Sequence, residues 1–591
     1  MFYKRSTKQT ETEAPAAKSN LKRQNITLVL LGVAIIVFAN IIASFVFTRF
    51  DLTSEKRYTL SDATKKMLSG VNDYIFFRIY LEGEFPAGFK RLRNETREML
   101  DEFKAYNKYI EYEFSDPNES PNDEDRKLVY QQLVEKGLMP TNLQVNDKEG
   151  SSQQIIFPGA LVTYHGQEMP VQLLSDQFGN APEEALNNSI QNLEYNLANT
   201  IRKLTATHKP KVAFIYGHGE LGPDETYDIR LALTEYYQVE RIKIDGQISA
   251  LTEHGTSDSN RVSIYNKYKA IVIASPDSVF TDRDKFIIDQ YIMRGGRVLW
   301  LVDGVNASID SLMHKNPTMG LANEINLEDQ LFKYGARVNF NLLLDASCLP
   351  IMLVTGRVGD KPKFSYMPWM FFPLASPASK HPMVNNLNPL KTQFTSSVDT
   401  IAVTGIKKTI LLSTSQYSRA VKSPVIIDLN MAKEKPDPEL LNQSYLPVAV
   451  LLEGKFESLF KHRMPPEIAN DKSIGFMEQG RYSQMIVVAD GDVIRNQLHR
   501  TKGYPLPLGF DQDTRQTFGN KEFVLNAMNY LIDETQLISI RSRELKIRLL
   551  DRKRVEDEKL KWQLMNIVLP IALILVFGFV KIYLRKRRFA K

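Results

Sequence analysis

The residues best suited to chemistry form a short run, His218-Gly219-Glu220, which follows the apolar segment 211–216. An imidazole and a carboxylate two positions apart could bind a metal ion or a polar ligand, or could move protons during hydrolysis. The alternative is structural, because glycines favour a tight turn and His218 could simply bond the main chain. A zinc site needs at least three protein ligands, and the run supplies two. Ligand binding and a structural turn are therefore the competing interpretations.

Acidic residues also follow three other apolar runs of the same kind. Asp303 follows LWLV, Asp490 and Asp492 follow MIVVA, and Asp245 follows RIKI. If these runs are parallel strands, their carboxyl ends meet at one edge of a sheet, where doubly wound folds bind their ligands. The acids could converge there, although Asp-Gly is also a common turn signal and structural turns are the competing interpretation. The candidate ligand-binding residues are His218, Glu220 and Asp303.

Several motifs that would identify an enzyme or a cofactor site are missing from the sequence. It contains no G-x-x-x-x-G-K-[ST] phosphate loop and no G-x-S-x-G nucleophile elbow, and the glycines near His218 do not match a dinucleotide fingerprint. Cys348 is the only cysteine, which excludes an intramolecular disulfide, a C-x-x-C redox motif and a cysteine-based metal cluster. No elbow surrounds it, so a buried structural thiol is favoured over a nucleophile. We therefore expect no catalytic residues, no cofactor and no metal.

The elements that position these residues follow a regular pattern over 209–535. Continuous apolar runs alternate with amphipathic helices, which is typical of a parallel sheet covered by helices on both faces. The expected strands are 211–216, 239–244, 270–274, 298–302, 425–429, 448–452 and 485–489, and the expected helices are 226–237, 281–293 and 521–532. Residues 305–420 and 453–480 are rich in Pro, Met and Asn, and we expect them to be irregular insertions. The pattern predicts a doubly wound α/β domain.

A smaller α/β domain is expected before it, over 48–180. Its predicted strands are 74–81, 109–115, 154–164 and 169–174, and its predicted helices are 90–106, 127–136 and one that begins near residue 62. A β-α-β start followed by further strands indicates a thioredoxin-like fold, and the missing C-x-x-C motif excludes redox chemistry. A helix over 182–206 forms most of a connector, 181–208, to the larger domain.

The mean hydropathy of −0.27 excludes a polytopic carrier, but two apolar segments are long enough to cross a membrane. Residues 26–47 contain no charge and would form about 33 Å of helix, against a hydrocarbon core of roughly 30 Å. A cleaved signal peptide is the rival interpretation, although its apolar region would be shorter. The second segment, 563–580, lies between Trp562 and Tyr583, where interfacial aromatics belong. Before it, 536–562 is expected to form a charged stalk helix that could run unbroken into the span.

The net charge of +6 is concentrated in the two tails. The tail 1–25 carries six basic and two acidic residues, and the tail 581–591 carries six basic residues and no acid. The rest of the chain has slightly more acidic than basic residues, so charge gives no reason to expect nucleic acid as a partner. Short basic segments stay in the cytoplasm, so we expect both tails there and the body outside, which in a bacterium is the periplasm. The basic stretch 541–561 runs against this rule.

Five segments, taken in order, resemble one known protein family. They are FDLTSEKRYTLS (50–61), YGHGE (216–220), DQYIMRGGRV (289–298), GNKEFVLNAMNYL (519–531) and ISIRSRELKIRLLD (538–551). Together they resemble GldG, the gliding-motility-associated auxiliary component of an ABC transporter in Bacteroidota, which is described as substrate-binding. The resemblance covers nearly the whole chain, including both apolar segments.

The resemblance implies an inner-membrane protein with a periplasmic domain, 209–535, related to class I glutamine amidotransferases. The amidotransferase nucleophile is a cysteine in a strand-to-helix elbow, and LWLVDGVNAS offers none at the matching strand, so we expect that activity to be lost. The implied partners are a membrane permease and, through it, a cytoplasmic ATPase, in an oligomeric complex linked to gliding or protein secretion. An envelope partner in the periplasm is a further expectation. The competing functions are a scaffold or force-coupling element without a ligand, and a hydrolase that uses the His218 and Glu220 loop with Asp303.

Overall fold

The computed structural model divides the chain into two compact units, residues 1–59 and 60–591. The described residues are 17–45, 59–147, 150–175, 182–256, 262–433, 437, 439–471, 474–533, 535–542 and 552–589. In the first unit, helix α1 spans Ala17–Phe45. Its segment Arg23–Ile41 is exposed and apolar enough to cross a membrane. The Asn40 side chain donates to the carbonyl oxygen of Ile36 at 2.9 Å, so this amide is bonded within its own helix.

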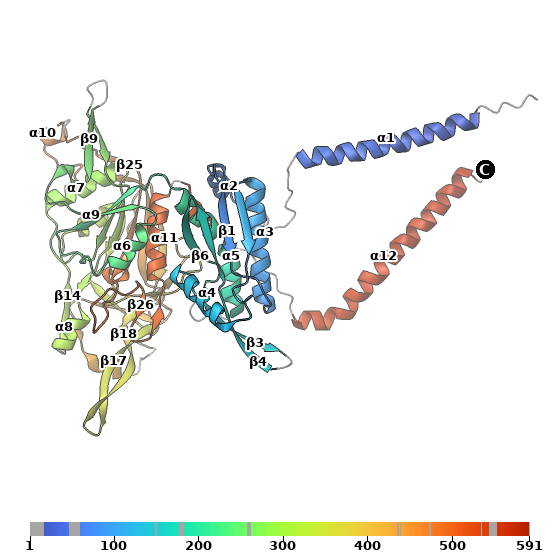
Figure 1. Ribbon diagram of the computed structural model, residues 1–591. Helices are drawn as coiled ribbons and strands as arrows, with labels where there is room; N and C mark the ends of the chain where they lie inside the picture. Colours follow the sequence, from blue (N-terminus) through green and yellow to red (C-terminus); the bar gives the residue numbers. More distant parts are fainter. Residues whose placement is uncertain are drawn as a thin grey trace, which may run out of the picture. The chain divides into compact units, whose positions relative to one another are not determined.

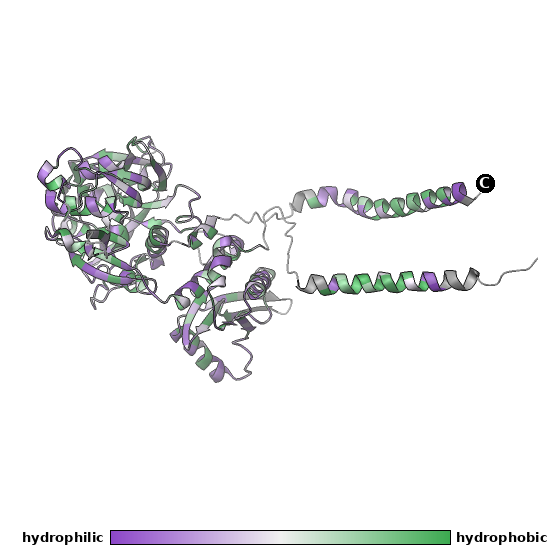
Figure 2. Cartoon of the chain, turned by 90° about the horizontal axis from the view of Figure 1, so that it is seen from above, coloured by the Kyte–Doolittle hydropathy of each residue, from purple (hydrophilic) through white to green (hydrophobic). Residues whose placement is uncertain are grey.

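The second apolar segment lies in helix α12, which spans Arg552–Phe589. Hydrophobic residues run along most of α12 and of α1, as Figure 2 shows. Pro570 lies inside α12 without ending it, which membrane helices tolerate. The helix runs without a break from Arg552 through the charged residues into the span, but residues 537–542 of the expected stalk form a separate 3-10 helix and 543–551 lie outside the described residues. The two helices are compatible with a two-pass membrane protein.

A four-stranded sheet in the order β2-β1-β5-β6 forms the centre of the small domain, residues 60–175. Its elements are α2 (Asp62–Ser69), β1 (Ile75–Ile79), α3 (Ala87–Tyr106), β2 (Ile110–Phe114), α4 (Asp123–Glu135), β3 (Thr141–Asp147), β4 (Gly150–Ile156), β5 (Gly159–Tyr164) and β6 (Gln167–Gln172). Strand β1 is parallel to β2 and antiparallel to β5. The single strand expected over 154–164 is wrong, because Pro158 separates β4 from β5 and β4 pairs with β3 in another sheet.

Helix α5, Pro182–Thr205, connects the small domain to the large one and is buried along much of its length. Its Glu194 carboxylate accepts hydrogen bonds from the Ser61 amide and the Thr64 hydroxyl at the start of α2, both at 2.7 Å. The short helix η4, Leu537–Ser542, also packs against α5. One apolar core therefore extends from the small domain through α5 and η4 to one face of the large sheet.

The large domain, in which Figure 1 labels strands β17, β18 and β25, is built on a mixed sheet. The strand order is β17-β18-β21-β24-β25-β12-β11-β7-β8, with β19 beside β18. Its strands are β7 (Lys211–Tyr216), β8 (Gln238–Lys243), β11 (Ala270–Ala274), β12 (Arg297–Leu301), β17 (Cys348–Val358), β18 (Lys361–Pro377), β19 (Leu390–Lys391), β21 (Ile406–Ser413), β24 (Pro447–Glu457) and β25 (Gln479–Val488). Strands β25, β12, β11, β7 and β8 are parallel, as the apolar runs predicted. The remaining strands extend the sheet in antiparallel fashion.

Two expected strands do not continue the parallel sheet. Strand β24 lies beside β25 but runs antiparallel to it, with Ala449 opposite Val488. Strand β23 (Val425–Ile427) pairs instead with β14 (Thr318–Ala322) in a separate sheet. An apolar run indicates that a strand is buried on both faces, but it carries no information about the direction of the strand. The parallel prediction is therefore wrong for 425–429 and 448–452.

Both faces of the parallel strands are covered, so alternate residues enter two different cores. On β12, for example, Leu299 and Leu301 enter one core and Trp300 enters the other. Helices α6 (Tyr227–Leu233) and α11 (Asn520–Ile532) contribute to the first core, and α7 (Asp282–Met293) and α9 (Glu328–Tyr334) contribute to the second. This double burial explains why the strands read as continuous apolar runs.

Residues 305–420 form antiparallel strands, both long and short, and two short helices, so the expected irregular insertion is wrong. The elements between β12 and β25 that belong to smaller sheets, or to none, are β13 (Val305–Asn306), α8 (Ile309–His314), β14, α9, β15 (Ala336–Val338), β16 (Asn341–Asp345), β20 (Val398–Thr400), β22 (Ser418–Lys422), β23, η2 (Leu429–Lys433) and α10 (Pro466–Ala469). A core of its own includes Trp369 and Phe371. Strands of two to five residues pair with partners far along the chain, such as β16 with β22, so no local alternation predicts them.

The other short elements of the large domain lie at its margins. They are η1 (Ile248–Ala250), β9 (Thr252–Thr256), β10 (Val262–Asn266), η3 (Gly491–Ile494), β26 (Phe510–Asp511) and β27 (Gln516–Thr517). The helix η3 follows soon after β25; it contains Asp492, and Asp490 caps its start.

Candidate functional site

A polar pocket lies where the parallel strands end. Because β7, β11, β12 and β25 run in the same direction, the residues that follow them meet at one edge of the sheet. We call this the strand-end pocket; its volume is about 200 Å³. Its polar lining residues include Ser275, Asp277, Asp303, Asn323, Asp492 and Arg495. Two of the acids that follow predicted strands, Asp303 and Asp492, therefore lie at the same edge of the sheet.

Asp303 is held by close packing at the centre of this edge. Its carboxylate accepts hydrogen bonds from the Ser275 hydroxyl and from the Gly491 amide, both at 2.8 Å. A Cβ atom on Gly491 would lie 2.5 Å from a carboxylate oxygen of Asp303 and closer still to Ser275. The Asp-Gly-Asp sequence therefore does more than form a turn, because Gly491 lets its backbone amide approach the Asp303 carboxylate.

Asp490 and Asp492 complete an acidic cluster with Asp303, in which Asp490 is fully buried and the other two acids are half-buried. Asp490 accepts hydrogen bonds from the Thr395 hydroxyl at 2.5 Å and from the Asp492 amide at 2.7 Å. Asp492 pairs with Arg495, with 2.6 Å between the nearest oxygen and nitrogen. Arg495 also lies 3.3 Å from a carboxylate oxygen of Glu225, so one cation serves two carboxylates.

Burial raises the pKa of all three carboxyls, because a charge in this site loses its hydration. The pKa of Asp303 lies above its ordinary value, and that of Asp490 lies well above it, since Asp492 and Asp303 also repel its charge. Burial raises the pKa of Asp492 to about 6, although Arg495 acts in the opposite direction. The three carboxyls therefore hold their protons to a higher pH than exposed carboxyls do.

His218 and Glu220 bond each other rather than facing this pocket. The His218 amide donates to the Glu220 carboxylate at 2.7 Å, and Nδ1 of the ring lies 3.3 Å from the same carboxylate. Nε2 lies 3.2 Å from Asp284, and the ring stacks on Phe280 with a centroid separation of 3.8 Å. His218 is only 7% exposed. Both ring nitrogens are thus engaged, which favours the structural interpretation of the His-Gly-Glu run.

The loop around His218 nevertheless shapes the strand-end pocket. Gly219 lines the pocket with a φ of +75°, and a Cβ atom there would lie 1.5 Å from the Asp277 carboxylate. Burial disfavours a charged imidazole, but the carboxylates of Glu220 and Asp284 outweigh it and raise the pKa of His218. The loop is therefore an ion-paired support for the backbone at this edge.

Asp284 is the partner that sequence reasoning missed. Its carboxylate accepts hydrogen bonds from the Thr281 hydroxyl and the Gly246 amide, both at 2.8 Å, in addition to its contact with His218. A signal was present, since Thr281 followed three residues later by an acid is a typical helix start. The fourth strand-end acid, Asp245, pairs with Lys243 at 3.2 Å in a turn with a φ of +49°, and it is not part of the cluster.

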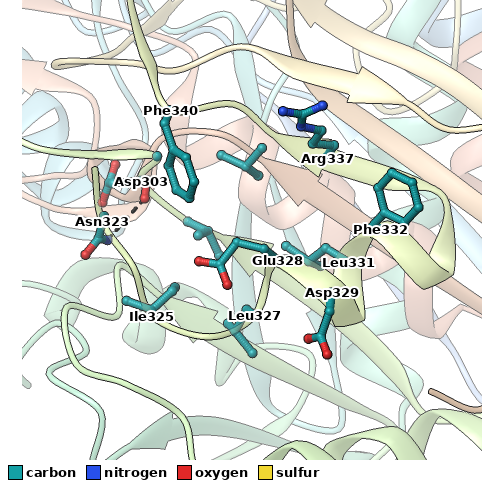
Figure 3. Close-up of a pocket in the computed structure, with 13 residues that line it drawn as sticks. Asp303, Asn323, Ile325, Leu327, Glu328, Asp329, Leu331, Phe332, Arg337 and Phe340 are labelled. Atoms are coloured by element: carbon teal, nitrogen blue, oxygen red, sulfur yellow. Dashed lines mark hydrogen bonds between the residues drawn. The ribbon is translucent and has the colours of Figure 1, made fainter. Parts of the chain in front are cut away.

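A second pocket shares Asp303 and Asn323 with the first (Figure 3). We call it the apolar pocket; its volume is about 310 Å³, and buried Val302, Ile325, Leu327 and Leu331 form much of its wall. Its other lining residues include Glu328, Asp329, Phe332, Arg337, Val338 and Phe340. These lie within 305–420, where the sequence carries no periodic signal, so this site could not be predicted.

The metal and thiol chemistry of the described residues is limited. Across the described part of the chain, no group of three or more His, Cys, Asp or Glu side chains is arranged to hold a metal ion. Cys348, at the start of β17, is partly buried, and burial raises the pKa of its thiol to about 11. The thiol therefore remains protonated at neutral pH, which makes it a poor nucleophile.

Comparison with known proteins identifies the family. A family model described as an ABC-type uncharacterized transport system matches residues 209–527, and a model for a domain of unknown function matches residues 54–163. An uncharacterized protein of Borreliella burgdorferi is 21% identical over 572 residues, which cover 95% of this chain and 98% of the relative.

Among solved structures, the mmIFT52 N-terminal domain aligns with 57% of this chain and 100% of its own, at 11% identity. Its TM-score of 0.29 is too low to support an argument about fold. The family model, by contrast, spans the whole parallel sheet and the strand-end residues described above. Because that model matches more than half of the chain, the protein belongs to the ABC-type uncharacterized transport system family, as an auxiliary component.

Proposed function

We propose that the protein is a non-enzymatic, membrane-anchored accessory subunit of an ABC transporter complex, and that its body binds a ligand at the carboxyl edge of the sheet. The observation that carries the ligand-binding part is the pair of pockets that meet at Asp303 and Asn323. Ligands of open α/β sheets bind at this edge, and a pocket of about 310 Å³ is large enough for a small molecule. Family membership and the two apolar helices support the transporter part.

The proposal includes an orientation and a set of partners. Both basic tails lie in the cytoplasm, the body lies in the periplasm, and α1 and α12 contact a membrane permease that is joined to a cytoplasmic ATPase. The tail charges support this orientation, because short basic segments are retained in the cytoplasm. As in the GldG proteins that the sequence resembles, the complex would serve gliding motility or the linked protein secretion. The small domain is proposed to be thioredoxin-like and the large domain to be related to glutamine amidotransferases.

Purification from the native membrane tests this assignment. A tagged full-length chain is extracted in mild detergent, and the proteins that accompany it are identified by mass spectrometry. The expected result is a stoichiometric permease together with an ATPase. Their absence from the preparation would rule out the accessory-subunit function, provided that another membrane complex from the same cells survives extraction.

A scaffold that couples force without a ligand is the second candidate, and one observation favours it. The continuous core through α5 and η4 joins the small domain to the large sheet. Arg541 on η4 is 5% exposed and donates to Asn526 at 3.0 Å and to the main chain of Asn385 at 3.2 Å. Such a rigid connection could transmit motion from the membrane. Ligand screening by thermal shift separates the two functions, because a ligand that binds only the folded state raises its stability.

A hydrolase is the third candidate, and the geometry argues against it. His218 is bonded on both ring nitrogens and covered by Phe280, so it has no free nitrogen with which to accept a proton from a nucleophile. A double substitution, His218→Ala with Glu220→Ala, tests this candidate directly. Cells that remain fully functional with the double variant exclude the hydrolase, whereas loss of function with a folded variant would support it.

A further inference from the structure

The mouth of the apolar pocket combines a cation with two exposed aromatic rings. Gly335 ends α9 with a φ of 110° and turns the chain into β15, so that residues on both sides of this turn reach the same pocket. Phe332 is 50% exposed and Phe340 is 37% exposed, although both line the pocket. Figure 3 shows Arg337 together with these two rings, and Ile325 and Leu327 across from them.

The Arg337 guanidinium has no partner among the described residues. It makes no ion pair or side-chain hydrogen bond with them, even though Asp399 stands opposite it in the β15–β20 ladder. Asp329, another charged residue of the pocket, pairs instead with Lys285 and Arg463. A guanidinium beside aromatic rings above an apolar wall matches a carboxylate attached to an apolar group, because the planar donors of arginine bind carboxylate oxygens in pairs.

The remaining polar groups of this pocket restrict the ligand further. Glu328 also lines the pocket, and it makes no ion pair or side-chain hydrogen bond within the described part of the chain. The Asn323 side-chain amide donates to the main-chain carbonyl of Asp303 at 3.1 Å. A second negative charge on the ligand would be repelled by the Glu328 carboxylate, whereas a hydroxyl or amine would be accepted. The lining therefore selects for a single negative charge, placed at the Arg337 end.

We propose that the apolar pocket binds an amphipathic monocarboxylate, with its apolar group against Ile325, Leu327 and Leu331 and its carboxylate on Arg337. This inference rests on the proposed ligand-binding function and names the chemistry of the ligand. The same chemistry occurs in a free aromatic or branched carboxylic acid and in the C-terminal residue of a polypeptide that ends in an apolar side chain. The volume of about 310 Å³ suits one such apolar group.

Calorimetric titration of the detergent-solubilised full chain tests the proposal with two matched pairs of probes. The first pair is 3-phenylpropionate and 3-phenylpropionamide. The second is the peptide N-acetyl-alanyl-alanyl-phenylalanine with a free carboxylate and the same peptide as its C-terminal amide. In whichever pair binds, we expect the acid to bind about 10- to 100-fold more tightly than the amide, which is the range for a hydrogen-bonded charge. Binding by the small acid alone, by the peptide acid alone or by both supports the proposal and identifies the source of the ligand.

Variants locate the site. Arg337→Gln should weaken binding of the acid about 10- to 100-fold and leave the weak binding of the amide unchanged. The matched control is Arg357→Gln, since Arg357 is another exposed arginine, lies on β17 and does not line the pocket. Equal binding of acid and amide, an undiminished affinity in Arg337→Gln, or no binding of either acid at millimolar concentration would overturn the inference. If the permease and ATPase still co-purify in that case, the accessory-subunit function stands and only the ligand assignment fails.

Discussion

The acidic cluster makes stability depend on pH in a direction opposite to that of most carboxylates. The pKa of Asp492 is raised from 3.8 to about 6 in the folded chain, so the folded state holds this proton more tightly than the unfolded state does. The contribution of Asp492 to stability is therefore most favourable below pH 4, and stability falls as the pH rises toward 6 and above. Substitution by Asn, which cannot ionise, should remove this dependence.

The interval between the unfolded and folded pKa values of Asp492 sets the size of this stability change. At 1.36 kcal/mol per pH unit, it corresponds to a penalty of about 3 kcal/mol at pH 7, of which about 1.3 kcal/mol arises between pH 5 and pH 7. We therefore expect wild-type protein to lose about 1 kcal/mol more than Asp492→Asn over that interval. The lost ion pair with Arg495 changes the absolute stability of the variant, so only the change with pH is compared.

Urea unfolding followed by tryptophan fluorescence provides the assay. Trp300 and Trp369 are fully buried in the large domain, and Trp562 in α12 can be replaced by Phe in both proteins to remove its signal. The matched control is Asp360→Asn, at an exposed position between β17 and β18, which should follow wild type at both pH values. If Asp492→Asn loses as much stability between pH 5 and pH 7 as wild type does, Asp492 does not hold its proton and the account of the cluster is wrong.

Three further predictions concern the supports of the site. His218→Gln should flatten the dependence of stability on pH above pH 6.5. Because the pKa of His218 is raised in the folded chain, its ion pairs stabilise the fold below pH 6.5 and lose that effect as the pH rises through the folded pKa. Urea midpoints at pH 6 and pH 8 measure the difference between the variant and wild type. Gly219→Ala should lower the free energy of unfolding by several kcal/mol, since it adds a clash with Asp277 to the strain of a positive φ. Gly166 has a similar φ but open space around it, so Gly166→Ala should lower it by only about 1 kcal/mol, and thermal melts compare the two variants. Arg541→Met should destabilise the packing of η4 against the large domain by about 3 kcal/mol, because it leaves the buried partners of Arg541 without hydrogen bonds. Faster proteolysis than in Arg541→Lys would show this loss, and equal rates would contradict the prediction.

The regular elements of the large domain could be predicted because each carries an apolar pattern in its own residues. Strands over 211–216 and 270–274 lie where the apolar runs predicted them, and the helix expected over 281–293 is α7. The helix expected over 182–206 is α5, along which apolar residues recur three or four positions apart: Leu186, Ile190, Leu193, Leu197, Ile201 and Leu204. Each of these elements is recognised from its own residues, since its pattern reflects burial on one or both of its faces.

Only part of the candidate site could be predicted from the sequence. Asp303 was expected at a strand end and lies there, whereas His218 and Glu220, chosen for the same reason, bond each other and Asp284. A position after a strand indicates which edge of the sheet a residue reaches, but not whether its side chain faces solvent or a neighbouring loop. The Asp284 carboxylate that engages His218 comes from a helix 66 positions along the chain.

By itself, the sequence determined the two apolar helices, the basic tails, the parallel strands and the edge where their loops gather. These follow from composition and local period, which depend on each segment's own contact with water, lipid or core. Only the tertiary structure decided the antiparallel half of the sheet, the burial of the acidic cluster and the apolar pocket around Arg337. These depend on pairings between residues far apart in the chain, as between β14 and β23 or Asp303 and Gly491, and such pairings leave no local pattern.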